Sequence, residues 1–310
     1  MKSRFALQSF AIMLVLVGSI PRATCAGGLA AYTRQEDVVY GRKDGMALTM
    51  DVLTPKEKPN GAAVIWVVSG GYYSSHEAIN PGFVGIFLNR GYTVFAVVHG
   101  SQPRYTIPDA IADLNRAVRY MRYHAKQFKI DPNRIGITGG SAGGHLSLMQ
   151  GTAGDLGNPK AKDPVDGTSS RVQAVACFFP PTDFLNYGKP GNVALGTGIL
   201  KDFPAPFEFR EYSPAKKCLV EITDEKRRLE IGRQISPVNH VSPDDPPTLI
   251  YHGDADTLVP IQQAESIMKK FKEAGVPAEL KIKKGAGHGW LTLPLDLPVL
   301  ADWFDKYLGK

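Results

Sequence analysis

Residues 139–143 (Gly-Gly-Ser-Ala-Gly) constrain the fold of this 310-residue chain more than any other stretch. Residues 134–138 before them read as a short buried strand, and residues 144–150 after them read as a helix. A serine on such a strand-to-helix turn projects its hydroxyl from the sheet edge, and small residues on either side let the backbone turn sharply. The alternative is a glycine-rich turn with an incidental serine, so the rest of the chain must decide.

Apolar, strand-like runs alternate with amphipathic, helix-like ones along the chain. Residues 62–68 and 93–98 are continuous apolar runs, which are typical of central parallel strands, whereas residues 47–53 alternate like an edge strand. We expect further strands at 172–179, 248–251 and 278–282, and helices at 83–90, from 108, 261–274 and 299–308. This order predicts an α/β fold with a mostly parallel central sheet and helices on both faces.

One segment, from about 181 to 245, interrupts this alternation. It lies between two expected strands and is too long for an ordinary connection. We interpret it as a small cap or lid insertion, with the aromatic residues Phe203, Phe207, Phe209 and Tyr212 as candidate pocket walls. The alternative is an irregular surface excursion whose aromatic side chains only pack against the domain.

The N-terminus has the order of a secretory signal peptide. Lys2 and Arg4 precede an apolar run from Phe10 to Val17, Pro21 ends the apolar stretch, and small residues follow. The run is too short for a permanent membrane anchor. We therefore predict a signal peptide at 1–26, cleaved after Cys25 or Ala26, and a secreted or periplasmic protein without a stable membrane anchor.

Charge and cysteine content exclude some classes of function. Removing residues 1–26 takes away three basic residues and no acidic one, which lowers the formal net charge from +6 to +3. This small net positive charge argues against nucleic acid as a partner. No spacing of cysteine and histidine resembles a metal site, and we expect none. Cys177 and Cys218 remain, either as a disulfide or with Cys177 as a buried free thiol.

A serine nucleophile needs a general base and an acid that orients it. His288 follows the last expected strand between glycines, which leave its ring free to reach Ser141, and it is our candidate base. The acid should also follow a strand. Asp256 is our preference, with Asp254 as the close rival and Asp183 as a weaker one.

An oxyanion hole needs backbone N–H groups from a second loop. Residues 69–73 (Ser-Gly-Gly-Tyr-Tyr) follow the expected strand 62–68 in the right place, and their glycines allow close approach to a substrate. We assign the oxyanion amides to Gly71, Tyr72 and Ala142. The alternative for the loop is a plain glycine turn.

With these elements in this order, the chain resembles the α/β-hydrolases. Within that fold it is similar to secreted carboxylesterases near the bacterial feruloyl and acetyl-xylan esterases and the hormone-sensitive-lipase relatives. The resemblance rests on residues 69–71, 108–120, 131–145, 252–260 and 287–289. The chain order Ser141, Asp256, His288 matches the family. The resemblance implies that residues 27–310 form one α/β-hydrolase catalytic domain.

The chain departs from the family pattern at two places near the expected pocket. The family's oxyanion loop usually reads His-Gly-Gly-Gly, whereas this chain has Ser69 for the histidine and Tyr72 for the third glycine. After the next strand, relatives often carry Tyr-Arg-Leu, where this chain has Val98-His99-Gly100. Both changes bear on substrate preference more than on the triad.

The sequence therefore predicts a secreted serine carboxylesterase that needs no cofactor. The expected substrates are short-chain or aryl esters, either small molecules or acetyl and feruloyl groups on polysaccharide. Two alternatives stay open: a prolyl-oligopeptidase-type peptidase, and a noncatalytic binding module on a hydrolase scaffold.

Overall fold

The structure is a computed structural model and describes residues 29–309. The predicted signal peptide at 1–26 lies outside the described residues. Among the helices of residues 29–309, none combines the length and the apolar character needed to cross a bilayer.

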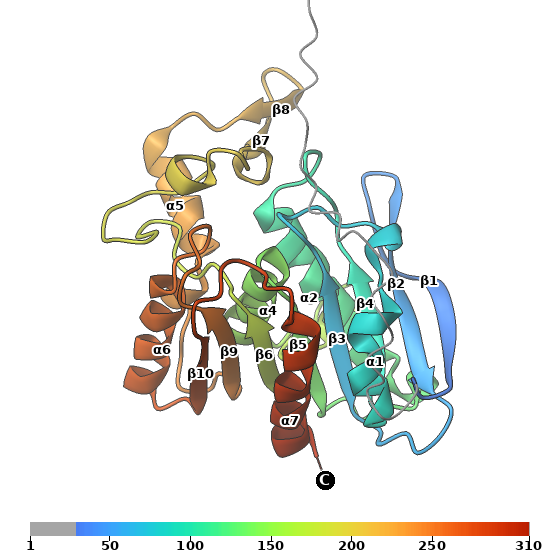
Figure 1. The fold of residues 1–310 in the computed structure, drawn as a ribbon. Coiled ribbons are helices and arrows are strands. Elements are labelled where there is room, and N and C mark those ends of the chain that lie inside the picture. Colours follow the sequence, from blue (N-terminus) through green and yellow to red (C-terminus); the bar gives the residue numbers. More distant parts are fainter. Residues whose placement is uncertain (1–28, 310) are drawn as a thin grey trace, which may run out of the picture.

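An eight-stranded sheet forms the centre of the molecule, in the order β1-β2-β4-β3-β5-β6-β9-β10 (Figure 1). β1 and β2 run antiparallel to their neighbours, and all other neighbouring strands are parallel. The strands are β1 Tyr32–Lys43, β2 Met46–Pro55, β3 Ala63–Val68, β4 Thr93–Val98, β5 Ile135–Thr138, β6 Ala174–Phe178, β9 Thr248–Gly253 and β10 Ala278–Lys283. This mostly parallel sheet confirms the predicted fold class.

Helices cover both faces of the sheet and bury two separate apolar layers. α1 and α7 pack on one face, and α2, α4 and α6 pack on the other. The helices are α1 Pro81–Asn89, α2 Ile107–Tyr123, α3 Ala125–Phe128, α4 Ala142–Ala153, α6 Gln262–Ala274 and α7 Leu297–Leu308. The continuous apolar runs of β3 and β4 are buried because helices cover them from both sides.

The expectation that residues 47–53 form an edge strand is wrong. β1 lies outside β2 and forms the edge instead. β1 was not predicted because most of its side chains are polar and only two of its residues are buried, so it shows no apolar run. The sequence does carry a signal for β1, the Asp-Gly pair at residues 44–45, which is typical of a two-residue hairpin turn. In the structure both residues have positive φ, as the turn between β1 and β2 requires.

The segment between β6 and β9 folds into the yellow and orange region at the top of Figure 1. It contains a two-stranded sheet, β7 Arg210–Ser213 with β8 Cys218–Glu221, and the helix α5 Glu225–Gln234. Two of its four candidate wall residues, Phe203 and Phe207, line the cavity described below. The other two were assigned wrongly, because Phe209 is buried in the core and Tyr212 is 59% exposed.

Both cysteines of the described residues are free thiols. Cys177 is buried in β6, and Cys218 is exposed on β8. The disulfide alternative is therefore wrong, and the buried thiol of Cys177 is confirmed. Burial raises the pKa of the Cys177 thiol well above its usual range, so this group packs as a small apolar side chain.

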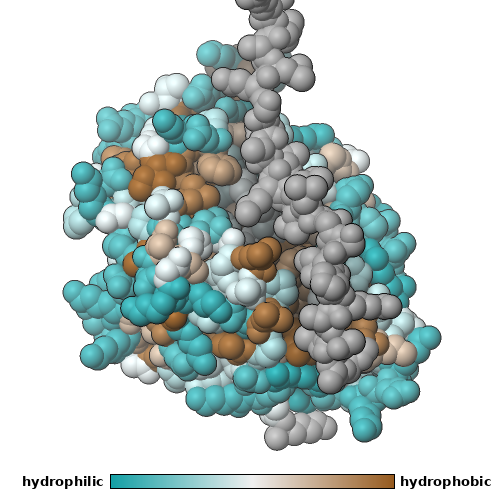
Figure 2. All heavy atoms as spheres, viewed as in Figure 1, coloured by the Kyte–Doolittle hydropathy of each residue, from teal (hydrophilic) through white to brown (hydrophobic). Residues whose placement is uncertain are grey.

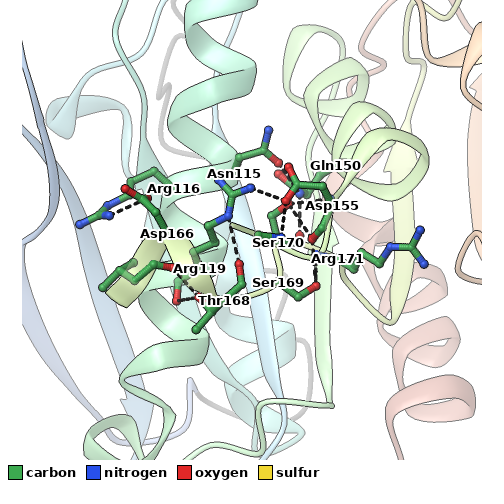
Figure 3. A network of polar contacts seen from close by, with 12 residues as sticks. Asn115, Arg116, Arg119, Gln150, Asp155, Asp166, Thr168, Ser169, Ser170 and Arg171 are labelled. Atoms are coloured by element: carbon green, nitrogen blue, oxygen red, sulfur yellow. Dashed lines mark hydrogen bonds and ion pairs between the residues drawn. The ribbon is translucent and has the colours of Figure 1, made fainter. Parts of the chain in front are cut away.

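A polar network fixes the connection between α4 and β6 against α2 (Figure 3). Arg119 of α2 donates to the Thr168 carbonyl and pairs with Asp155. Ser170 accepts from the Asp155 amide at 2.9 Å, and Gln150 of α4 donates to the Ser170 carbonyl at 2.6 Å. These bonds hold the C-terminal end of α4, whose N-terminal end begins directly after Ser141.

The face of the molecule in Figure 2 is mainly hydrophilic, with several separate apolar patches. Exposed apolar side chains are normal on a folded domain, because apolar atoms still contribute much of its accessible surface. The most exposed large apolar side chains are Leu291, Leu156, Leu295 and Leu219.

Candidate active site

Ser141 sits on a strained turn between β5 and α4. Its φ is 55°, a conformation that costs energy for any residue with a Cβ. Close backbone contacts favour glycine at two neighbouring positions, Gly139 and Gly143. A Cβ on Gly139 would lie 2.6 Å from the Gly143 carbonyl carbon, and one on Gly143 would lie 3.0 Å from the Val67 oxygen. The turn is thus built as the sequence pattern predicts.

The structure brings together the three side chains chosen from the sequence. His288 Nε2 lies 2.8 Å from Ser141 Oγ, and His288 Nδ1 lies 2.8 Å from Asp256 Oδ2. Asp256 follows β9 and His288 follows β10, so both side chains come from the carboxyl ends of parallel strands. The edge of the Phe179 ring packs on the imidazole of His288, with the ring centres 4.6 Å apart.

Asp256 is held as a buried carboxylate. Its side chain is fully buried, which by itself opposes ionisation, but the hydrogen bonds from His288 and from the Val259 amide, with His252 Nε2 3.5 Å from Oδ2, outweigh burial. Together they keep the pKa of Asp256 well below its usual range. Oδ1 accepts from the amides of Leu258 and Val259 at 3.0 and 2.9 Å, which leaves Oδ2 for the imidazole of His288.

The rival carboxylates are engaged elsewhere. Asp254 accepts from the Gly285 amide at 2.6 Å and pairs with Lys284. Asp183 caps its own turn by accepting from the amides of Leu185 and Asn186.

Other histidines also have structural partners. His252 Nε2 donates to the Val259 carbonyl at 2.8 Å, so it braces the loop that carries Asp256. His145 is buried in α4 and donates to the Ile235 carbonyl at 2.7 Å. These contacts leave His288 as the imidazole beside Ser141.

The three amides assigned to the oxyanion hole lie around one space. Gly71, Tyr72 and Ala142 all line the same cavity as Ser141. Within residues 29–309, their N–H groups donate to no protein acceptor. Three unpaired N–H groups beside a nucleophile can receive a hydrogen-bond acceptor from a ligand.

That cavity is small and mainly apolar. Its volume is about 30 Å³, and the 181–245 segment supplies much of its wall. The lining side chains beyond those already named are Pro181, Phe184, Tyr187, Leu200, Phe203, Phe207, Leu258 and Val259. Sequence reasoning missed most of them. The available signal for Pro181, Phe184 and Tyr187 is their position just after the strand β6, at the edge where the site forms.

A group of metal-ligating side chains occurs on another part of the described chain. Glu36, Asp51 and His76 each offer an atom within 4.8 Å of the others. Arg34 already pairs with the buried Asp51 and with Glu36, so a cation there would have to displace the guanidinium.

Comparison with known proteins identifies the family. Residues 50–271 match BD-FAE. The chain belongs to the BD-FAE family. This BD-FAE chain is 28% identical over 246 residues to "Probable carboxylic ester hydrolase LipM" of Mycobacterium tuberculosis, covering 78% of its own length and 52% of that relative. With esterase LipC of the same organism it shares 26% identity and covers 60% of the relative. The chain thus spans just over half the length of these curated relatives.

Solved structures resemble the BD-FAE chain over nearly its whole length. A truncated carbohydrate esterase from gut microbiota has a TM-score of 0.71 and 26% identity, covering 91% of this chain and 98% of that one. An acetyl ester-xyloside bifunctional hydrolase from Caldicellulosiruptor lactoaceticus has a TM-score of 0.67 and 25% identity, covering 91% and 96%. These relatives and structural neighbours are named as esterases or ester hydrolases, and the BD-FAE chain has the α/β-hydrolase fold, as the sequence predicts.

Proposed function

We propose that this BD-FAE protein hydrolyses carboxylic esters of short acyl groups through Ser141, His288 and Asp256. The observation that carries the proposal is the pair of 2.8 Å contacts that links the three side chains next to a cavity with three unpaired amides. The geometry matches what acyl transfer needs: a nucleophile, a base in contact with it, an orienting carboxylate and N–H donors for the developing oxyanion.

In this mechanism His288 Nε2 takes the proton of Ser141 as Oγ attacks the ester carbonyl carbon. The carbonyl oxygen becomes negatively charged and is held by the amides of Gly71, Tyr72 and Ala142. The tetrahedral intermediate collapses, the C–O bond to the alcohol breaks, and His288 returns its proton to the departing oxygen. Water, deprotonated by His288, then attacks the acyl-enzyme and releases the acid and Ser141.

The cavity is assigned to the acyl group. The alcohol must leave on the side of His288, because His288 protonates it. His288 does not line the cavity, whereas the oxyanion amides do. The cavity is small and walled mainly by apolar side chains, so a short acyl group suits it. Of the substrates expected from the sequence, the acetyl ester therefore suits the cavity better than the feruloyl ester.

The surroundings of the substrate are part of the proposal. Two of the structural neighbours, a carbohydrate esterase and an acetyl ester-xyloside bifunctional hydrolase, support acetyl groups on polysaccharide as the target. The signal-peptide pattern of residues 1–26 supports export to the periplasm or the medium, where such polymers occur. The 181–245 segment acts as the cap that closes the acyl cavity.

A substrate panel tests this function. The full chain is assayed with p-nitrophenyl acetate, butyrate and octanoate, with acetylated xylan and methyl ferulate, and with a proline p-nitroanilide. We expect the acetates to react fastest and the anilide to be inert. Faster cleavage of the anilide than of every ester would favour the peptidase alternative. Failure of a fluorophosphonate to label Ser141, together with no ester turnover, would favour the noncatalytic module.

Phe203 is expected to limit acyl length. Its ring closes the cavity over the oxyanion turn, since a Cβ on Gly71 would lie 3.1 Å from Phe203 Cε1. Phe203→Ala should therefore raise the ratio of kcat/KM for butyrate over acetate by about tenfold or more, because each methylene that finds room contributes binding. Initial rates with the p-nitrophenyl esters measure the ratio. Tyr212→Ala, an exposed aromatic of the same segment, should leave it unchanged. An unaltered ratio in Phe203→Ala would contradict the assignment of the acyl cavity.

A further inference from the structure

The oxyanion turn has a conformation that needs support. Gly70 and Tyr73 exchange two backbone hydrogen bonds at 3.0 and 2.9 Å, which makes Gly71 and Tyr72 the two central residues of a tight turn. Both have positive φ, 54° and 65°. Glycine adopts this conformation freely, but Tyr72 carries a bulky side chain and is strained there. Contacts outside the turn must hold it in place.

The two departures from the family pattern meet beside this turn. Ser69 Oγ lies 2.9 Å from His99 Nε2, although the residues are 30 positions apart. The sheet register explains the contact: β3 and β4 are parallel with Val68 paired to Val98, so residues 69 and 99 are the next pair. The loop histidine that the family pattern places at the start of the turn is absent here, and the imidazole that contacts this turn comes from the end of the neighbouring strand.

The hydrogen-bond partners fix the direction of the contact. His99 Nδ1 lies 2.9 Å from the Gly100 carbonyl, which can only accept, so Nδ1 carries the proton. Nε2 is then an acceptor, and the Ser69 hydroxyl donates to it. His99 is almost completely buried, and this burial lowers the pKa of His99 to about 4, so the ring stays neutral near pH 7.

Further bonds attach the same turn to residues 99–102. The Ser74 hydroxyl bridges the two strand ends, because it donates to the Val68 carbonyl at 2.5 Å and accepts from the His99 amide at 3.1 Å. The Gln102 amide donates to the Tyr72 carbonyl at 3.1 Å. The supporting segment is itself anchored, since the Gly100 amide donates to Asp113 at 2.8 Å.

We infer that His99 is a positioning residue for the oxyanion hole, acting through the Ser69 hydroxyl to hold the amides of Gly71 and Tyr72 toward the acyl cavity. This inference rests on the proposed function. Oxyanion donors help only when they are already aimed at the place where charge develops, so a looser turn weakens binding of the tetrahedral state more than binding of the ester.

Ser69→Ala and His99→Phe test this role with two readouts. The first is kcat and KM for p-nitrophenyl acetate. The second is the inhibition constant of ethylboronic acid, whose short chain suits the acyl cavity: Ser141 Oγ bonds to boron, its proton passes to His288, and a boron-bound oxygen lies toward the amides. In both variants we expect kcat and boronate affinity to fall together by about tenfold, with KM nearly unchanged. Ser69→Thr, which keeps a hydroxyl, should restore most of the loss.

A double variant and a matched control separate this role from general destabilisation. If the two residues act through one bond, Ser69→Ala/His99→Phe should lose no more than the worse single variant. Ser170→Ala removes the hydroxyl of a buried serine in the network of Figure 3, and it should lower thermal stability without changing boronate affinity. Equal losses in Ser170→Ala and Ser69→Ala would overturn the inference.

The outcomes also distinguish this inference from the proposed function. If the wild type is active and both Ser69→Ala and His99→Phe keep kcat and boronate affinity within about twofold of it, the positioning role alone is ruled out. A wild type that hydrolyses no ester and binds no boronate would remove the proposed function, and the positioning role with it, because no oxyanion would then form beside the turn.

Discussion

Replacing Ser141 by alanine is expected to lower kcat for p-nitrophenyl acetate by about 10⁴- to 10⁶-fold. The hydroxyl is the atom that would bond to the acyl carbon, and no other side chain lies in its place 2.8 Å from His288 Nε2 within the part of the chain that the structure describes. Initial rates measure the loss. Mass spectrometry of the protein treated with a fluorophosphonate should find the label on Ser141 in the wild type and no label in the variant.

The backbone strain at Ser141 provides a control for folding. Alanine keeps the Cβ, so Ser141→Ala should retain the strain of a positive φ, whereas Ser141→Gly should relieve it. We expect the glycine variant to be as inactive as the alanine variant and to melt at a higher temperature. Ester turnover by either variant within about tenfold of the wild type would rule out Ser141 as the nucleophile.

Asp256→Asn is expected to lower kcat by about 10³- to 10⁴-fold. The asparagine oxygen can still accept from the amides of Leu258 and Val259, so the loop should keep its shape. Its NH₂ group would then face His288 Nδ1, where it favours the imidazole tautomer with the proton on Nε2. That tautomer cannot take the proton of Ser141. Steady-state kinetics with p-nitrophenyl acetate measure the effect.

Asp254→Asn is the matched control, because it makes the same chemical change two residues away. Asp254 accepts from the Gly285 amide, which an asparagine oxygen can also do, and it has no contact with His288. We expect its activity to stay within about twofold of the wild type. The opposite pattern, an inactive Asp254→Asn and an active Asp256→Asn, would transfer the acid role to the rival residue.

Several features of this BD-FAE protein could be predicted because their causes are local in sequence. Continuous apolar runs marked β3 and β4, because a strand covered on both faces has no polar side. The glycines around Ser141 marked the elbow, because the backbone passes too close for any Cβ at Gly139. His288 was the candidate base because it follows a strand in a glycine-rich loop. Each of these signals lies within a few residues of the feature that it marks.

Other features depend on which distant segments meet, and no local pattern contains that information. Asp256 and Asp254 are two residues apart in one loop, and only the folded loop aims one at His288 and the other at Gly285. The size of the acyl cavity depends on how the 181–245 segment packs over Gly71. The contact of Ser69 with His99 depends on the register of β3 and β4. In the sequence alone, Ser69 and His99 are two unrelated departures from the family pattern. Because side chains reach only a few ångströms, the pairing of the two strands is what makes them partners.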